Sequence, residues 1–314
     1  MKKITILLVL SAGVLFADQI DVTVSEGTDQ SVIVSLSPKP ASPEADADTN
    51  VKLCFNEPLA PMRMPQAVRL KRLTNNSQNS GWFGTFLGMG HQNTDERIRG
   101  NVVYDTQNNC LIFDPDNNLS VGFYEVETKP LMLQTMPPKN YVSTIRYRFY
   151  VPEVINGFKL PPEPDEDKNN ETLLGIDFND NGIRDDVERL IIIEEAKNTE
   201  FPKTQTAISL QYAFAWQKMI EAPTIESRKY LEDASACQEY FVNKNTKGLN
   251  FKEYREWEKN HASKLGVHLE DAIFNTKERI LRRFEFNRAC SGHIFDLSPA
   301  SIDKCMINID KIGE

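Results

Sequence analysis

The pattern of apolar residues in this chain changes once, on either side of a proline-rich segment near its middle. Before about residue 151, short runs of alternating or β-branched residues are separated by clusters of Pro, Asn, Asp and Gly. After residue 183 the apolar residues recur at the three- and four-residue spacing of helices. Two such patterns in 314 residues predict two domains. We therefore expect a multi-domain α and β fold.

Residues 18–151 are predicted to form a β-sandwich. Several short strands separated by turn residues are typical of two packed antiparallel sheets. The predicted strands are Ser31–Leu36, Val51–Phe55, Ala67–Leu73, Asn101–Tyr104, Cys110–Phe113, Phe123–Leu133 and Tyr141–Tyr150.

Residues 183–314 are predicted to form an all-α helical domain. The second helix carries apolar residues on every side, including Ile208, Phe214 and Met219, and should therefore be central and buried. The first helix is expected to begin near residue 183, and the second helix to end before Pro223. Three more are expected over 224–242, over 251–265, and from a capping box at Asn275 and Glu278 to about Ala289.

Residues 152–176, between these parts, are predicted to be a linker. The run Leu160-Pro-Pro-Glu-Pro164 favours a stiff, extended chain. The run Asp165–Asn170 is polar and suits a solvated segment.

Residues 177–188 have a regular arrangement of oxygen-bearing side chains. They fall at positions 1, 3, 5, 9 and 12 of the segment, and a glycine, Gly182, falls at position 6. Calcium takes six to eight oxygen ligands, and this spacing wraps them around one ion. The sequence therefore predicts a calcium loop. Its ligands would be Asp177, Asn179, Asn181, the carbonyl of Ile183, Asp185 and Glu188.

A simpler interpretation of this segment stays open. Asp, Asn and Gly are ordinary turn residues, and Asp185 with Glu188 could be the N-cap and third residue of a helix. That interpretation leaves the alternation of Asp177, Asn179 and Asn181 without a reason.

The loop resembles those of thrombospondin type-three repeats and dockerins, which are EF-hand-like. The preceding segment, Asn169–Ile176, is too short and polar for a full incoming helix, so we expect an exit helix alone. The resemblance implies a structural ion and weak binding, with dissociation constants up to about 10⁻⁴–10⁻³ M.

The first 17 residues have the features of a signal peptide. Lys2 and Lys3 precede an apolar run from Ile4 to Phe16, and Ala17 suits cleavage. Such a run is too short to span a membrane. We therefore expect an exported protein, periplasmic or extracellular, with no membrane span.

The chain is acidic. Its formal charge is −9, and removal of Lys2 and Lys3 with the signal segment would lower it to −11. This argues against nucleic acid as a partner.

Five cysteines in an exported chain suggest disulfides with one thiol left over. Bridges within domains would join Cys54 to Cys110, and Cys237 to Cys305 or Cys290. Alternation points Cys54 and Cys110 away from the core face, so they can bridge only if their strands are neighbours.

A series of short motifs keeps its order through the first half of the chain. The motifs are Ser37-Pro38, Phe55-Asn-Glu-Pro58, Leu111-Ile-Phe-Asp-Pro115, Leu119-Ser-Val-Gly-Phe-Tyr-Glu-Val126 and Ile145-Arg-Tyr-Arg-Phe149. This series resembles the bacterial Ig-like domains of surface and envelope proteins. The resemblance covers about residues 31–151 and implies an Ig-like β-sandwich that serves as a spacer or adhesive module.

A second resemblance spans roughly residues 155–310. Leu160-Pro-Pro-Glu-Pro164, the run from Leu174 to Arg189 and Asn275-Thr-Lys-Glu-Arg279 look similar to exported bacterial proteins of unassigned function. It implies the calcium loop and the helical domain, and it brings no activity.

Residues that could carry catalysis are few. His261 and His268 lack a clear third zinc ligand, and neither His91 nor His293 has an evident acidic partner. Cys290 has no base nearby in sequence and is expected to be bridged or buried. The arginines of the last helix, Arg279, Arg282, Arg283 and Arg288, are expected on a solvated helix face, with an anion site as the alternative.

These features favour a non-enzymatic, calcium-binding envelope or secreted protein with a structural, adhesive or interaction role. Its partner would be a protein or glycan of the cell envelope. One alternative is a periplasmic enzyme with a site in the helical domain. Another is a glycan-binding module that uses Trp82 in the glycine-rich segment 81–90.

Overall fold

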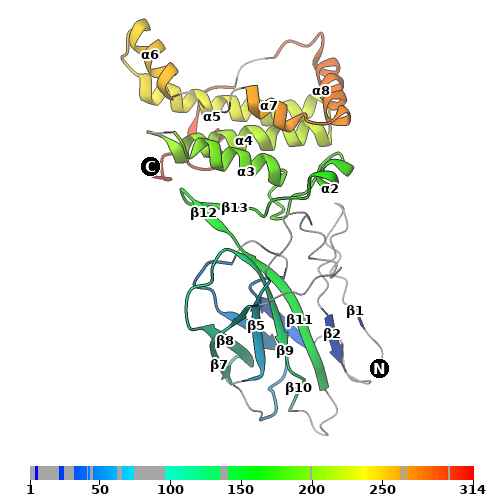
Figure 1. The fold of residues 1–314 in the computed structure, drawn as a ribbon. Coiled ribbons are helices and arrows are strands. Elements are labelled where there is room, and N and C mark those ends of the chain that lie inside the picture. Colours follow the sequence, from blue (N-terminus) through cyan, green and yellow to red (C-terminus); the bar gives the residue numbers. More distant parts are fainter. Residues whose placement is uncertain are drawn as a thin grey trace. The chain divides into compact units, whose positions relative to one another are not determined.

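The computed structural model describes residues 4–5, 21–24, 32–40, 42, 45–61, 66–73, 96–134, 141–198, 200–261, 263, 265, 267–295 and 298–314. The chain divides into two compact units, with a boundary between Glu153 and Val154. Strands form the first unit and helices most of the second (Figure 1). The predicted order, a β part followed by an α part, is confirmed. The predicted signal peptide and the glycine-rich segment lie almost entirely outside the described residues.

The first unit contains two antiparallel sheets. One has the order β1 (Ile4–Thr5), β2 (Asp21–Val24), β11 (Tyr141–Val151), β9 (Gly122–Thr128), β5 (Val68–Arg72), β6 (Glu96–Ile98), with β10 (Leu131–Met132) also on β11. The other has the order β3 (Ile33–Ser37), β4 (Val51–Phe55), β8 (Cys110–Pro115), β7 (Gly100–Asp105).

The two sheets share one apolar core. Leu53 and Leu111 come from the β3–β4–β8–β7 sheet, and Leu70 and Val126 come from the other; all four are fully buried in one cluster. In β5 the buried residues Val68 and Leu70 alternate with the exposed Arg69, as the period of two in a strand requires, whereas β4 is buried from Leu53 to Phe55. The first unit is therefore built as a β-sandwich.

A disulfide joins neighbouring strands of the second sheet. Cys54 of β4 lies directly opposite Cys110 of β8, and the two are bridged. The predicted pairing is confirmed, and both half-cystines are buried.

The second unit begins with regular structure where the sequence suggested a linker. β12 (Glu153–Ile155) and β13 (Phe158–Leu160) form a two-stranded hairpin, and α2 (Glu166–Glu171) follows. Asn156 and Gly157 both have positive φ, 50° and 84°, as a two-residue type I′ turn requires. The side chain of Asp165 caps α2 by accepting from the N–H of Lys168 at 3.1 Å.

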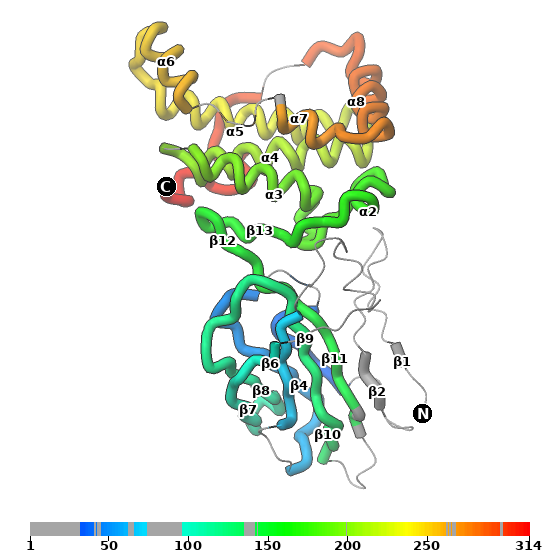
Figure 2. Tube along the Cα trace, viewed as in Figure 1, coloured from blue at the N-terminus to red at the C-terminus, as the bar shows by residue number. Residues whose placement is uncertain are grey.

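Most of the remaining helices pack against α4 (Pro202–Glu221), which runs beside α5 (Arg228–Thr246) (Figure 2). As predicted, α4 is buried along its length. The helices are α3 (Asp185–Glu195), α4 (Pro202–Glu221), α5 (Arg228–Thr246), α6 (Phe251–His261), α7 (Val267–Ile273) and α8 (Lys277–Cys290), with 3₁₀ turns η2 (Ile225–Ser227) and η3 (Ile302–Lys304).

Two details of the last helices differ from the sequence interpretation. The predicted helix over 251–265 ends at His261, and α7 is a separate helix. The N-cap of α8 is Thr276, whose hydroxyl accepts from the N–H of Arg279, while Asn275 accepts from the guanidinium of that arginine.

The second bridge joins Cys237 of α5 to Cys305 after η3, so Cys290 is the free thiol. The expectation that Cys290 is bridged or buried is wrong, because Cys237 is bridged to Cys305 and Cys290 stays half-exposed. Among the helices described, none is both long and apolar enough to cross a bilayer.

Candidate metal centre

The segment 177–188 is held at both ends by the helical unit. Before it, the Ile176 N–H donates to the Asn169 Oδ1 of α2 at 2.8 Å, and the Ile176 carbonyl accepts from the Asp185 N–H at 2.8 Å. Within it, the buried side chain of Ile183 packs with Val187 in the helical core. The loop therefore has fixed ends.

Two residues of the loop adopt the left-handed conformation. Asp180 has φ of 55°, which Asp and Asn tolerate better than most residues, and Gly182 has φ of 83°. A Cβ on Gly182 would also lie 2.8 Å from Cε2 of Phe214. Both the turn and the packing of α4 therefore require glycine at 182.

The predicted ligands are folded into one small loop. The Asp177 carboxylate accepts from the N–H groups of Gly182 at 2.7 Å and Asn181 at 3.1 Å. The Asn179 amide donates to Glu188 Oε2 at 3.0 Å, and Asp185 accepts from the Phe178 N–H at 3.0 Å. These contacts orient side chains of positions 1, 3, 9 and 12 toward the loop's own backbone and toward one another.

Burial disfavours the charged forms of three carboxylates in the loop, Asp177, Asp185 and Glu188. Asp185 is 1% exposed and Glu188 is 5% exposed. Burial, with the negative charge of Asp177 as a smaller cause, raises the pKa of Asp185 to about 9 and that of Glu188 to about 7. Burial also raises the pKa of Asp177. The charged forms of these three carboxylates are therefore disfavoured in the folded loop.

The nearest basic residues face elsewhere. The Arg184 guanidinium binds Asp186, with Nε 2.5 Å from Oδ1, and the carbonyl of Ile273. Arg189 donates to the Pro161 carbonyl at 2.6 Å. Within the described parts of the chain, no Lys, Arg or His forms an ion pair with Asp177, Asp185 or Glu188.

As the side chains stand, the described residues contain no group of three or more His, Cys, Asp or Glu arranged to hold a metal. A site in this loop would also need the oxygens of Asn179, Asn181 and the Ile183 carbonyl. These are oxygen donors of the kind that hard cations prefer.

The helix-cap interpretation of Asp185 does not agree with the geometry. α3 starts at Asp185 itself, and the capping position belongs to Arg184, which makes no side-chain cap bond. Asp185 instead reaches back across the loop to Phe178.

The histidines do not form a site among the described residues. His261 of α6 contacts Glu200, with Nε2 2.5 Å from Oε2, and stacks on Trp257. His268 lies on α7, and His293 stacks on Phe295 after α8. No contact joins these three histidines, and His91 lies outside the described residues.

The arginines of α8 do not share one solvated face. Arg279 is fully buried, and its guanidinium donates to Asn170 Oδ1 at 2.9 Å and to the carbonyls of Asn169, Thr172 and Leu173. Burial, with the positive charge of Arg184 as a smaller cause, lowers its pKa to about 10. The expected solvated face is wrong for this residue because its guanidinium ties α8 to the end of α2.

The other arginines of α8 lie nearer the surface. Arg282 pairs with Glu285, with Nη1 3.0 Å from Oε2, and Arg283 pairs with Glu270 of α7, with Nη2 2.8 Å from Oε2. Arg288 is exposed. These three residues agree with the expectation of a solvated face.

Cys290 lines a cavity of about 260 Å³ between α5 and α8. Glu232, Ser235 and Glu239 also line it, and Arg228 there is paired with Glu232. Among the described residues that line this cavity there is no histidine.

The chain matches no family model and no curated protein. Solved structures similar to part of it include PcoC, a copper resistance protein from Escherichia coli, at 17% identity and TM-score 0.22, over 36% of this chain and 99% of that chain. CopC from Methylosinus trichosporium OB3b is 18% identical, with TM-score 0.23, over 38% of this chain and 90% of that chain. Scores this low support no inference about this chain.

Proposed function

We propose that this protein is a non-enzymatic, calcium-binding exported protein with a structural, adhesive or interaction role. The observation that carries the calcium proposal is a pair of buried carboxylates, Asp185 and Glu188, with raised pKa values and no ion pair to a basic residue in the described part of the chain. A divalent cation would supply the missing charge. Calcium suits a site made only of oxygen ligands on a short, turned loop.

The proposed ion would stabilise the start of the helical unit. Asp177 follows Ile176, which is tied to α2, and Glu188 lies in the first turn of α3. An ion that joins the two ends of the loop would hold α2 and α3 together, as EF-hand-like loops with an exit helix do. This role is structural and requires no substrate.

Export and an Ig-like first unit are part of the same proposal. Two disulfides suit an oxidising compartment outside the cytosol. Two antiparallel sheets around one core are the architecture that an Ig-like spacer or adhesive module needs. The proposed partner is a protein or glycan of the cell envelope. Nucleic acid is disfavoured by the charge of −9.

Calcium titration by isothermal calorimetry tests the proposal. The wild-type protein should bind one calcium per chain, with magnesium as the comparison. The double variant Asp177→Asn/Glu188→Gln should not bind. Asp180→Asn is the matched control, because it removes a charge from the same loop at a position outside the ligand set and tolerates the left-handed backbone. Equal calcium binding by all three proteins would overturn the proposal.

A further inference from the structure

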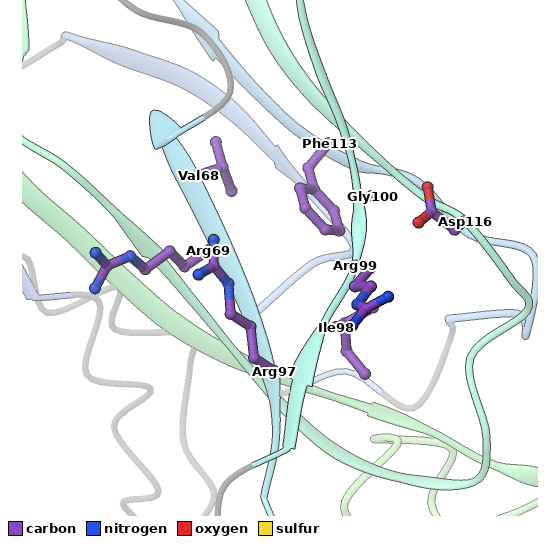
Figure 3. Close-up of a pocket in the computed structure, with 8 residues that line it drawn as sticks. All are labelled: Val68, Arg69, Arg97, Ile98, Arg99, Gly100, Phe113 and Asp116. Carbon is purple, nitrogen blue, oxygen red and sulfur yellow. The ribbon is translucent and has the colours of Figure 1, made fainter.

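A cavity of about 500 Å³ opens at one edge of the sandwich, far along the chain from the calcium loop. Its size falls within the range of small-molecule sites, about 300–1,000 Å³. Three arginines and one acid line it beside apolar side chains (Figure 3). The lining residues are Val68, Arg69, Arg97, Ile98, Arg99, Gly100, Phe113 and Asp116.

The crossing between the two sheets builds this cavity. β6 is the last strand in the order of one sheet and ends at Ile98, and β7 of the other sheet starts at Gly100. A Cβ on Gly100 would overlap the Asp114 carbonyl and lie 2.7 Å from Cζ of Phe113. The Asp116 N–H donates to the Arg99 carbonyl at 3.0 Å and fixes the turn after β8. The arginines therefore project from a defined backbone.

The charges around the cavity are unbalanced. Arg97 lies directly opposite Lys71 in the strand register, and like charges at that position destabilise a pair. Arg69 lies opposite Glu127, but Glu127 is engaged by Arg146 with Nη2 2.6 Å from Oε1.

The three arginines are also without acidic partners. In the described part of the chain, neither Arg69, Arg97 nor Arg99 forms an ion pair. Asp116 is the one acid that lines the cavity. On a protein with a charge of −9, this is a local excess of positive charge with space beside it.

We propose that the cavity binds a small anionic sugar, one that carries a phosphate or a carboxylate. Arg97 and Arg99 stand on two sides of the space below the Phe113 ring (Figure 3), and guanidinium forks suit the planar geometry of carboxylate and phosphate oxygens. Ile98, which is partly exposed, offers apolar contact for the body of the ligand, whereas Val68 and Phe113 form the buried floor of the cavity and are 2% and 3% exposed. Asp116 accepts from a sugar hydroxyl.

The affinity should depend on salt. All three arginines are exposed in the free protein, and surface charges are screened within about 8 Å at physiological ionic strength. Binding by Arg97 and Arg99 therefore weakens as sodium chloride is added, whereas contact through Ile98 alone would not.

The experiment is a titration followed by amide chemical shifts of the full mature chain in the presence of chelator, which separates this site from the calcium loop. The probes are glucose 6-phosphate, glucuronate, inorganic phosphate and, as the neutral comparison, glucose. We expect saturable shifts at Val68, Ile98 and Gly100 with the two acidic sugars, weaker shifts with phosphate and none with glucose.

Two variants with the same change in charge complete the test. Arg97→Gln/Arg99→Gln should weaken glucose 6-phosphate binding by about a hundredfold, or about tenfold for each charge-assisted contact. Arg255→Gln/Lys259→Gln removes two exposed charges from α6 and should leave binding unchanged. Arg99→Lys keeps the positive charge without the guanidinium fork and should weaken glucose 6-phosphate binding by an intermediate factor.

The proposal fails if the acidic sugars give no saturable shift around the cavity. It also fails if both double variants weaken binding equally, since that result would mean attraction to general surface charge. Saturation by inorganic phosphate with the same affinity as glucose 6-phosphate would overturn the proposal that the cavity recognises a sugar. The cavity would then bind an adventitious ion only. An unchanged amide spectrum of each variant outside the cavity confirms that it is folded.

Discussion

Glu188 and Asp185 are held where their charged forms are disfavoured. Both are almost inaccessible to solvent, and burial raises their pKa values to about 7 and about 9. Without a cation, the folded loop therefore keeps protons that the unfolded chain would release. The same two side chains are the predicted ligands at positions 9 and 12, where a cation would replace those protons.

The stability of the chelated protein should fall as pH rises. A carboxyl whose pKa is raised by folding stabilises the fold below its unfolded value, about 4, and loses that contribution as pH rises through the folded value. The pH window in which this stability is lost therefore runs from about 4 to about 7 for Glu188 and from about 4 to about 9 for Asp185. The free energy of unfolding should drop by several kcal/mol between about pH 5 and about pH 8, because each carboxyl contributes about 1.4 kcal/mol per pH unit within its window.

Urea denaturation followed by tryptophan fluorescence measures this change, because Trp216 and Trp257 lie in the helical unit. Saturating calcium should reduce the pH dependence, since calcium binds the deprotonated carboxylates. A chelated protein that is as stable at about pH 8 as at about pH 5 would contradict the assignment.

The substitution Glu188→Gln should have opposite effects with and without metal. It removes a buried charge while keeping the shape of the side chain, so the chelated protein should gain about 1–2 kcal/mol at neutral pH. The same variant should lose the stabilisation by calcium, because a bidentate ligand is gone. Unfolding by urea with calcium and with chelator gives both values. A variant that is less stable in chelator and still responds to calcium would refute the ligand role.

At the scale of elements, Arg184 connects the loop to the last helices. Its side chain is fully buried, pairs with Asp186 and donates to the carbonyls of Ala272 and Ile273 at the end of α7. The last carbonyls of a helix have no partner within it, so this guanidinium serves as the cap of α7. Gly175 leaves room for it, because a Cβ there would collide with the Arg184 side chain.

Replacing Arg184 with Met should destabilise the helical unit by about 3 kcal/mol, because a buried pair is broken and two carbonyls lose their donor. Arg255→Met is the matched control; Arg255 is an exposed arginine whose pair with Glu258 lies on the surface of α6, and its loss should cost under about 1 kcal/mol. Guanidinium chloride unfolding compares the two. Equal effects would show that Arg184 does not anchor α7.

The elements that the sequence revealed are those with strong periodicity or clear stop signals. The buried helix α4 was predictable because its apolar residues fit the helical period of about 3.6 residues, and the strands β4 and β8 because theirs fit the strand period of about 2 residues. The hairpin at 153–160 was missed although Asn156-Gly157 is a strong turn signal, because Pro and acidic residues nearby suggested a linker. The end of α6 and the start of α7 were missed because the polar residues around this boundary show no periodic pattern of apolar side chains.

The same comparison applies to the candidate site. Spacing alone was enough to propose all six ligands, because loop positions are local in the sequence, and their binding of calcium stays a prediction. The role of Arg184 was not visible, since its partners on α7 lie 88 and 89 residues away. Arg279 was placed on a solvated face because three other arginines of α8 suit one, and only tertiary contacts with α2 show that it is buried.

At the scale of the whole molecule, each unit carries its own disulfide. Alkylation without reductant should modify one cysteine, Cys290, and alkylation after reduction should modify all five. Closing loops of 56 and 68 residues stabilises each unit by about 4 kcal/mol at most, so reduction should lower the unfolding midpoints of both. Mass spectrometry with peptide mapping checks the pairing. A Cys237–Cys290 bridge would contradict the fold of the helical unit.

Thermal unfolding of the protein with calcium and with chelator tests the central claim most directly. A ligand that binds only the folded state must raise the midpoint. The calcium proposal predicts a higher midpoint in calcium for the wild-type protein and for Asp180→Asn, and no calcium effect for Asp177→Asn/Glu188→Gln. A wild-type midpoint that does not change at calcium concentrations well above about 1 mM, the weak end for such loops, would contradict it and reduce residues 177–188 to a closed turn.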